Sequence, residues 1–344
     1  MKRIICICVS VALGLLPGCA EPAEKPQFFC TQERVCDLRY GEREYDLLQS
    51  GEDTGIVIPG LKQNFVPQGI CYIKAEDLIL LSGYFMPLSG KLSSALLALD
   101  GATGELVGEY TLTDASGRNV GGHFSGIGAS EWDLYVTGRN CLYRVALSSL
   151  LDAGSRGAIP VEQKIPMEIS ADACNFSQGE LWVCEYYQED KYPLEGNHEM
   201  RCEDQTVHHA WMLGYAVEDG LELKCIFSVP DKVQGITRLA DGSFLLSQSY
   251  GRKNPSSVLI YEDPRGQMPD AVVEVDGEKI PLWHLDSGHL LQCVSAPPMS
   301  EGCCVKGEGV YLLFESAAYY YNGLDPNNRS THPTDTIWYY KFEK

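Results

Sequence analysis

The sequence lacks the short motifs that identify many enzyme classes. It contains no P-loop and no dinucleotide-binding fingerprint, so motifs give no support to a nucleotide cofactor. It also lacks the GxSxG turn on which α/β-hydrolases hold a nucleophilic serine. No CxxC pair is present, and the adjacent Cys303 and Cys304 are poorly spaced for zinc. Motifs alone therefore name no reaction.

Basic residues are scarce. The chain has 344 residues, with 27 Lys and Arg against 47 Asp and Glu and a formal charge of −20. Because such a surface repels phosphate backbones, we expect no nucleic-acid partner. A hydrophobic share of 44% with 22% charged residues is typical of a globular protein.

The sequence has no long apolar run outside its N-terminus. Residues 1–18 join a basic start to an apolar run too short for a membrane span, which predicts a signal peptide. The next residue, Cys19, ends a Leu-Pro-Gly-Cys pattern that resembles a bacterial lipobox, although Pro17 departs from the usual small or aliphatic residue. The alternative is an ordinary secretory signal cut after Ala20. We expect residues 19–35 to be a lipid-anchored tether.

These features predict an exported protein. It would be a membrane-anchored lipoprotein on the cell surface or in the periplasm, touching the membrane only through its lipid, with secretion as the alternative. Of 14 cysteines, 11 follow Cys19, so at least one thiol stays unpaired or pairs between chains. In an oxidising compartment, disulfides are plausible between Cys30 and Cys36 and between Cys202 and Cys225.

Helical patterns are nearly absent, and only Ala146–Asp152 could form one or two turns. The chain instead repeats a polar residue, a small residue and an apolar residue or Cys, followed by a turn and an apolar strand. The spacings between the five copies are 57, 47, 62 and 67 residues, and the copies begin at Gln68, Ser125, Asp172, Gln234 and Glu301. Further strands follow in most copies, and a repeated unit of four antiparallel strands predicts a β-propeller.

We therefore predict an all-β protein with a single propeller domain over residues 36–344. Five blades fit the repeats, with six as the alternative, and we expect a monomer. Ala271–Val275 is the expected outer strand of the fourth unit. The fifth unit has three strands and ends with Thr336–Phe342. Because closure removes exposed strand edges, we expect Cys36–Ile58 to supply the missing outer strand of the last blade.

Two segments carry a resemblance to known proteins. Val66-Pro67-Gln68-Gly69-Ile70 followed by LILLSGY, and Gly121-Gly122-His123 followed by SGI, resemble secreted bacterial β-propeller proteins of unassigned function. A looser similarity is to lactonase and strictosidine-synthase-like propellers, whose motifs do not match residue by residue but whose central channel binds calcium. The resemblance implies the fold and a candidate calcium ion, and it leaves the activity open.

In a propeller blade, the innermost strand starts and the second strand ends on the same face. We therefore expect ten side chains to converge on one mouth of the channel. The starts supply Gln68, Ser125, Asp172, Gln234 and Glu301, and the second-strand ends supply Tyr84, Arg139, Glu185, Gln248 and Glu315. Long loops rich in Tyr and His, Tyr187–Val207 and Ala317–Asp335, leave the same face. Such aromatic groups suit a small polar molecule or a carbohydrate.

Three hypotheses describe this mouth. The leading one is a binding module without catalysis, in which the ring residues hold a ligand or partner. The second is a hard-cation site for Ca²⁺ with oxygen ligands from Asp172, Glu301, Gln68 and Gln234. The third is a Ca-dependent hydrolase, lactonase-like or a glycoside hydrolase, with catalytic groups drawn from Asp172, Glu301, Glu185 and His123. A purely structural interpretation competes with all three, because these residue types also cap free backbone groups at strand starts.

Overall fold

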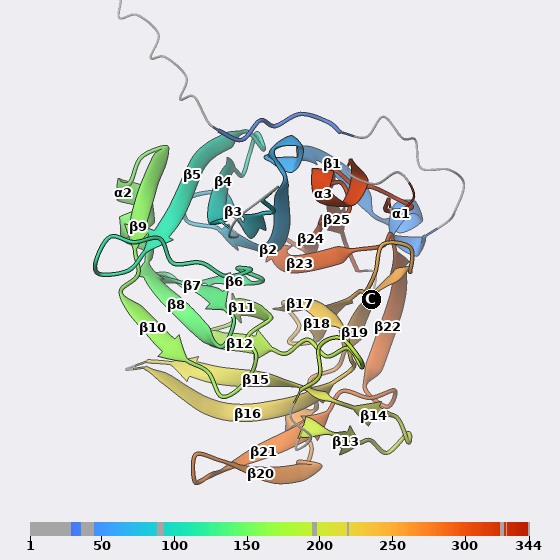
Figure 1. Cartoon of the computed structure of the whole chain (residues 1–344). Coiled ribbons are helices and arrows are strands. Elements are labelled where there is room, and N and C mark those ends of the chain that lie inside the picture. The colour runs from blue at the N-terminus through green and yellow to red at the C-terminus, as the bar shows by residue number, and fades with distance from the viewer. Residues whose placement is uncertain are drawn as a thin grey trace, which may run out of the picture.

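The structure is a computed structural model that describes residues 29–35, 45–87, 93–194, 198–218, 220–323, 327 and 329–342. The expected signal peptide, Cys19 and Cys36 lie outside these residues. Five sheets surround a central axis, one for each blade, which confirms the all-β five-bladed propeller (Figure 1). No helix among the described residues is long and apolar enough to cross a membrane.

In each blade, four antiparallel strands follow one another from the axis outward. Blade one contains β2 (Phe65–Ile73), β3 (Leu78–Phe85), β4 (Ser93–Asp100) and β5 (Leu106–Thr113). Blade two contains β6 (Ile127–Ala129), β7 (Asp133–Gly138), β8 (Cys141–Ala146) and β10 (Gln163–Pro166). Blade three contains β11 (Ala173–Ser177), β12 (Glu180–Cys184), β15 (Ala210–Val217) and β16 (Leu221–Val229). Blade four contains β17 (Val233–Arg238), β18 (Phe244–Gln248), β19 (Ser256–Tyr261) and β22 (Leu290–Ala296).

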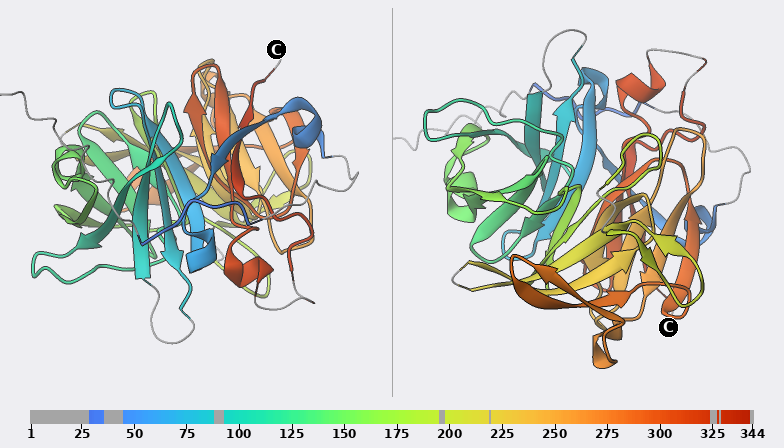
Figure 2. Two further views of the ribbon diagram at one scale, coloured as in Figure 1. Left: turned by 90° about the horizontal axis from the view of Figure 1, so that it is seen from above. Right: turned by 60° about the horizontal axis from the view of Figure 1, so that its bottom comes forward.

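Blade five closes the ring with an N-terminal strand. It contains β23 (Ser300–Lys306), β24 (Gly309–Phe314), β25 (Thr336–Tyr340) and, outermost, β1 (Glu52–Val57). The β1–β25 register pairs Glu52 with Tyr339 and Val57 with Thr336. Figure 2 shows β1 crossing beside the last strands of the chain. The expected closure by the segment before the first repeat is confirmed.

The fourth unit departs from the sequence prediction. Its outer strand is β22, whereas Ala271–Val275 forms β20, which pairs with β21 (Glu278–His284) at the outer edge of blade three. A two-residue turn at Asp276 and Gly277, both with positive φ, pairs β20 with its neighbour in sequence and withdraws it from blade four. An additional strand, β9 (Arg156–Pro160), pairs in parallel with β5 of blade one.

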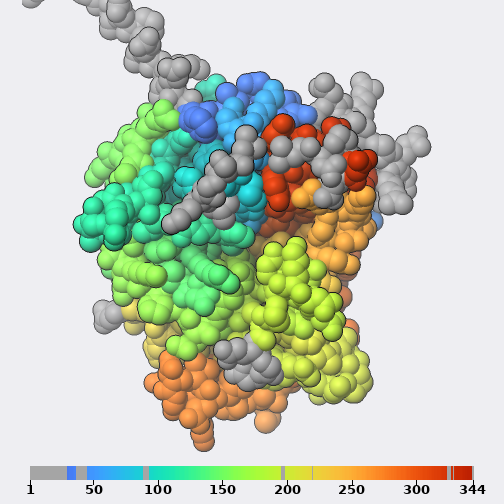
Figure 3. All heavy atoms as spheres, in the orientation of Figure 1, coloured from blue at the N-terminus to red at the C-terminus, as the bar shows by residue number. Residues whose placement is uncertain are grey.

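The remaining elements are short. They are α1 (Asp46–Ser50), η1 (Leu61–Gln63), α2 (Leu147–Asp152), β13 (Met200–Arg201), β14 (Val207–His208), η3 (Pro264–Gly266) and α3 (Tyr319–Asn322). The position of α2 confirms the one helical segment expected from the sequence. The β13–β14 hairpin belongs to the segment between β12 and β15, whose yellow-green atoms form a raised lobe on the face seen in Figure 3.

Apolar side chains from facing sheets fill the space between blades. Between blades three and four, Trp182 packs edge-on against Phe244 with ring centroids 4.7 Å apart. A cyclic ion network covers this contact: Arg238 and Arg265 each bridge Glu180 and Asp263, with N–O distances of 2.7 to 2.8 Å. These contacts fix neighbouring blades relative to each other.

The expected disulfide between Cys202 and Cys225 is wrong, because both residues are free buried thiols. Cys225 lies on β16 close to Arg265, whereas Cys202 lies in the turn of the β13–β14 hairpin and contacts His208. Cys30 is also a buried free thiol, and its expected partner, Cys36, is outside the described residues.

Candidate functional site

The small residue of each repeat lies where the five inner strands come closest together. A Cβ atom on Gly69 would lie 2.9 Å from the Cα of Gly126, and one on Gly126 would lie 2.3 Å from the nitrogen of Cys174. The Gly235 and Gly302 positions are equally tight. The cavity left on the axis is about 10 Å³, room for one water at most. The mouth is therefore blind, and a ligand would meet its floor rather than pass through.

In blades one, four and five, the innermost strand contains a β-bulge, and the polar residue that begins the repeat is the extra residue of that bulge. The strand register shifts by one residue between Pro67 and Gly69, between Val233 and Gly235, and between Ser300 and Cys303. A bulge re-aims one side chain out of the ladder. Gln68, Gln234 and Glu301 belong to three different blades. Because each lies at a bulge, its side chain can turn toward the mouth and contact side chains of the neighbouring blade.

The centre of this cluster is a pair of carboxyl groups. Glu301 on β23 and Glu315 directly after β24 are buried, with 2% and 8% of their surfaces exposed. Their carboxyl groups are close enough for a side-chain hydrogen bond between them, which raises the pKa of Glu301 and lowers that of Glu315. Because two buried carboxylates in contact cannot both ionise at low cost, the pair holds a proton at neutral pH.

Burial is the main cause of the raised pKa at both positions. It raises the pKa of Glu301 well above its usual range, and the charge of Glu315 adds to the effect. Burial raises the pKa of Glu315 to about 7, against hydrogen bonds from Tyr321, Glu301 and Gln68 that favour its ionised form. The pair can thus exchange a proton close to physiological pH.

Two amides tie the pair to neighbouring blades. Nε2 of Gln68 donates to Oε2 of Glu315 at 2.9 Å, and Nε2 of Gln234 donates to Oε1 of Glu301 at 3.2 Å. Three of the four expected calcium ligands, Gln68, Gln234 and Glu301, therefore belong to one hydrogen-bonded cluster. In this arrangement their amide N–H groups, not their oxygens, are directed at the carboxyl groups.

Tyrosines form the wall around the pair. Tyr321 on α3 donates a hydrogen bond to Glu315 and shares another with Tyr84, at the end of β3. The guanidinium of Arg252 lies 4.8 Å from the centre of the Tyr321 ring. Tyr186, after β12, lies close enough to Glu301 for that carboxyl to contribute to raising its pKa, although burial contributes more.

Sequence reasoning missed Arg252, and it identified Tyr321 only as one member of an aromatic loop. Both residues lie on connections between strands rather than at strand ends, so the repeat gives no signal for them.

Asp172 lies on the blade-three side of the mouth. Its Oδ2 accepts a hydrogen bond from the backbone nitrogen of Tyr186 at 3.0 Å, and its carboxylate also bonds the Ser170 side chain. Burial raises its pKa, while these hydrogen bonds and the charge of Arg139 act in the opposite direction. The hydrogen bonds hold the start of the innermost strand to the connection leaving β12, as the structural interpretation anticipated.

Glu185 is held by hydrogen bonds to His198 and to the backbone of Trp211, apart from the Glu301–Glu315 pair. Its Oε2 bonds Nδ1 of His198 at 2.8 Å and accepts from the backbone nitrogen of Trp211 at 2.9 Å. The His198 ring stacks on Trp211 with centroids 3.9 Å apart. Glu185 is only 1% exposed, so the structure uses it to anchor the lobe between β12 and β15.

The other expected site residues have separate surroundings. His123 stacks on Tyr84 with ring centroids 4.8 Å apart, and burial, with the charge of Arg139, lowers its pKa. Ser125 lines the narrow axial cavity. Nε2 of Gln248 donates to the carbonyl oxygen of Asp231 at 2.9 Å, which uses that amide in a backbone contact.

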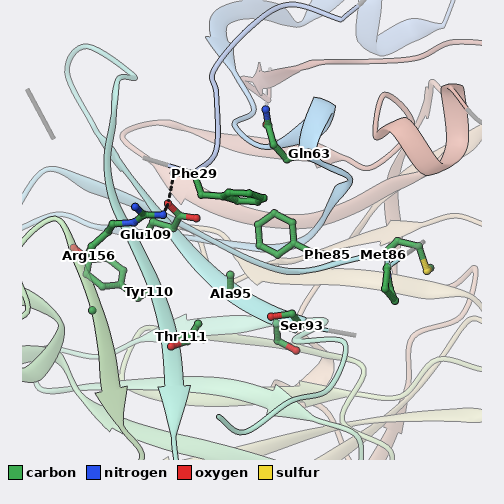
Figure 4. A pocket seen from close by; sticks show the side chains of 13 residues that line it. Phe29, Gln63, Phe85, Met86, Ser93, Ala95, Glu109, Tyr110, Thr111 and Arg156 are labelled. Carbon is green, nitrogen blue, oxygen red and sulfur yellow. Dashed lines mark hydrogen bonds and ion pairs between the residues drawn. The ribbon is translucent and has the colours of Figure 1, made fainter. Parts of the chain in front are cut away.

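A larger cavity of about 580 Å³ lies on the outer side of blade one (Figure 4). Phe85 of β3 lines this cavity, whereas its neighbour Tyr84 faces the mouth, because adjacent residues on a strand point to opposite sides. The opposite wall carries Glu109, which pairs with Arg156 at 3.1 Å and accepts from the nitrogen of Phe29 at 2.9 Å. Its lining residues come from scattered segments, so no sequence pattern predicts this cavity.

Comparisons with known proteins add little to this geometry. No protein-family model matches the chain, and no curated protein matches it. Among solved structures, the chain is similar to the crystal structure of Myxococcus xanthus glutaminyl cyclase, at 12% identity and a TM-score of 0.40. That match covers 74% of this chain and 87% of the cyclase chain. A likeness at this level carries no argument about activity, so the chain stands as a five-bladed β-propeller with no family assigned.

Proposed function

We propose that the protein is an exported binding protein that holds a small polar ligand at the channel mouth. The observation that supports this most strongly is the buried Glu301–Glu315 pair. Placing two carboxyl groups out of water in contact with each other costs free energy that an apolar or amide pair would avoid. Buried acidic groups with perturbed pKa values are typical of functional sites.

The surroundings of the pair indicate the ligand class. Tyr186 and Tyr321 are partly exposed beside the pair, and tyrosine rings attract cations, as the Arg252 guanidinium over the Tyr321 ring shows. An amino group entering the mouth would replace the shared proton as the counter-charge of the two carboxylates. We therefore propose a small ligand that combines an amino group with hydroxyl groups, as amino sugars do.

Export and anchoring belong to the same proposal. The short apolar run at the N-terminus followed by Cys19 supports lipidation, and the sequence after Cys19 supports a tether. A propeller held at the membrane by its lipid would present its mouth to ligands outside the cytoplasm.

A second candidate function is hydrolysis at the same mouth. A carboxyl with a pKa of about 7, as at Glu315, is suited to general acid and base catalysis near neutral pH, and Glu301 is in hydrogen-bonding contact with it. Calcium could join this site by displacing the shared proton, with rotated Gln68 and Gln234 amides supplying oxygens. Hydrolysis requires turnover, which distinguishes it from binding alone.

Titration calorimetry with glucosamine, glucose and CaCl₂ as separate probes tests these proposals. The binding proposal expects heat from glucosamine, little from glucose, and at least a tenfold loss of glucosamine affinity in Glu315→Gln and Tyr321→Phe. Glu131→Gln, an exposed substitution away from the mouth, is the matched control. Undiminished affinity in both mouth variants, or no binding of glucosamine by the wild type, would contradict the proposed site and ligand class.

The hydrolase is tested on chromogenic glycosides and lactones with and without calcium. Turnover that Glu315→Gln abolishes and that Glu131→Gln leaves unchanged would establish catalysis at the pair. Calcium binding that both glutamate substitutions remove would place the ion at the pair. An absence of turnover with every substrate leaves binding as the better account.

A further inference from the structure

A second cluster of ligating side chains lies away from the mouth, at the β13–β14 hairpin. We propose that Cys202, Asp204, His208 and Asp286 form a structural binding site for a divalent transition metal, with zinc as the ion that best fits the donors. Sγ of Cys202 and one carboxylate oxygen each from Asp204 and Asp286 all lie within 4.8 Å of one another. Nδ1 of His208 lies 3.5 Å from Sγ of Cys202.

These separations are close to those of a tetrahedral zinc site. Bond lengths of about 2.0 to 2.3 Å to zinc place two ligand atoms roughly 3.3 to 3.8 Å apart. The Cys202–His208 distance of 3.5 Å falls within that range, and the ligand atoms of Cys202, Asp204 and Asp286, which lie within 4.8 Å of one another, would have to approach by up to roughly 1.5 Å. Thiolate and imidazole donors favour zinc over calcium or magnesium.

The backbone holds the donors in place from two directions. Pairing of Met200 with His208 in the hairpin sets Cys202 in its turn and His208 at its end. Asp286 comes from the turn after β21. The two turns are joined because the nitrogen of Ser287 donates to Oδ2 of Asp204 at 3.1 Å.

Burial indicates that the cluster needs a partner charge. Cys202 is 2% exposed, His208 is 5% exposed and Asp286 is 8% exposed. The buried Asp286 carboxylate accepts a hydrogen bond from the backbone nitrogen of Gly288 at 2.9 Å, and a divalent cation would add a counter-charge for it beside the thiol and the imidazole. Oγ of Ser228 lies 3.1 Å from Nδ1 of His208 and 2.8 Å from Nδ1 of His284, so the Ser228 hydroxyl would bond His284 alone once Nδ1 of His208 binds the metal.

The position of the site gives it a structural role. The hairpin is part of the segment from Glu185 to His209, whose other end carries the Glu185–His198 anchor beside the mouth. A metal ion bridging this segment to the turn after β21 would stabilise it against the outer strands of blade three. Metal binding would therefore raise thermal stability by binding only the folded state.

Cobalt substitution tests the proposal on the full mature protein. Adding Co²⁺ should give about one bound ion per chain and a thiolate-to-cobalt charge-transfer band, and Zn²⁺ should displace it and raise Tm. The band should disappear in Cys202→Ser and persist in Cys293→Ser, which changes an exposed cysteine elsewhere. His208→Gln and Asp286→Asn should each weaken Zn²⁺ binding at least tenfold, which keeps the test valid if Cys202→Ser does not fold.

Any of four results would overturn the proposal, and the first three concern cobalt and zinc. They are the absence of a charge-transfer band in the wild type, a band that survives Cys202→Ser, and Zn²⁺ affinity unchanged in both His208→Gln and Asp286→Asn. Calcium binding at the same place without zinc would also contradict it, because the thiolate would then have no role.

Discussion

Replacing both members of the mouth pair, in Glu301→Gln/Glu315→Gln, should change how stability depends on pH. In the folded protein, burial raises both pKa values, that of Glu315 to about 7 from an ordinary value of 4.5, and the contact with Glu315 raises that of Glu301 further. A carboxyl whose pKa is raised on folding binds its proton more tightly in the folded state. Its contribution to stability is therefore fully present below pH 4.5 and is lost as pH rises through about 7.

The magnitude follows from the shift. One pKa unit corresponds to about 1.4 kcal/mol, so the shift at Glu315 removes on the order of 3 kcal/mol of unfolding free energy between pH 5 and pH 8. Glu301 acts in the same direction at higher pH. Glutamine keeps the shape and a hydrogen-bonding group but does not titrate, so the double variant should lose this pH dependence and exceed the wild type in stability at pH 8.

Guanidinium denaturation followed by tryptophan fluorescence at pH 5, 6, 7 and 8 measures the effect. The difference between wild type and double variant is the relevant quantity, since other groups titrate in both proteins. Glu131→Gln serves as the control and should follow the wild type. Parallel curves for the wild type and the double variant from pH 5 to 8 would refute the assignment of a shared proton to the pair.

Three further predictions concern the fold and its anchoring. Gly126→Ala would place a Cβ atom 2.3 Å from the nitrogen of Cys174 and should cost about 1–3 kcal/mol or more in denaturant unfolding, whereas Gly266→Ala, with nothing within 4 Å, should not. Arg265→Ala leaves the partly buried carboxylates of the inter-blade network with one cation fewer and should lower stability by about 1–3 kcal/mol; an unchanged Tm would contradict this. Cys19→Ser should abolish metabolic labelling with fatty acid, and labelling that persists would refute the lipobox.

The blades and their order could be predicted from the sequence because most strand pairs are formed by neighbours in sequence. Each repeat is a hairpin with its own turn, so the blades and their order follow from contacts between neighbours in sequence. The closing strand β1 was also predictable, because three strands in the last unit leave one edge to cover. Ala271–Val275, which forms β20, was assigned to the wrong blade, because it pairs with β21, whose parallel pairing to β16 joins segments distant in sequence.

The candidate site was likewise predictable in part. Strand starts and ends correctly brought Glu301 and Glu315 to one mouth, since both positions follow from the blade geometry. Their hydrogen bond and shared proton depend on bulges and on burial, which the repeat does not encode. Glu185 was expected to join them, yet His198 binds it from a loop whose path the sequence does not specify.

The central claim is that a proton is shared between two buried carboxyl groups at the mouth, and NMR titration of protein labelled with ¹³C at the glutamate carboxyl carbons tests it directly. We predict one glutamate resonance that titrates near pH 7 and one that stays protonated through neutral pH, assigned by their loss in Glu315→Gln and Glu301→Gln. If every glutamate carboxyl of the wild-type protein titrates below about pH 5, near the ordinary glutamate pKa, the account of the mouth is wrong.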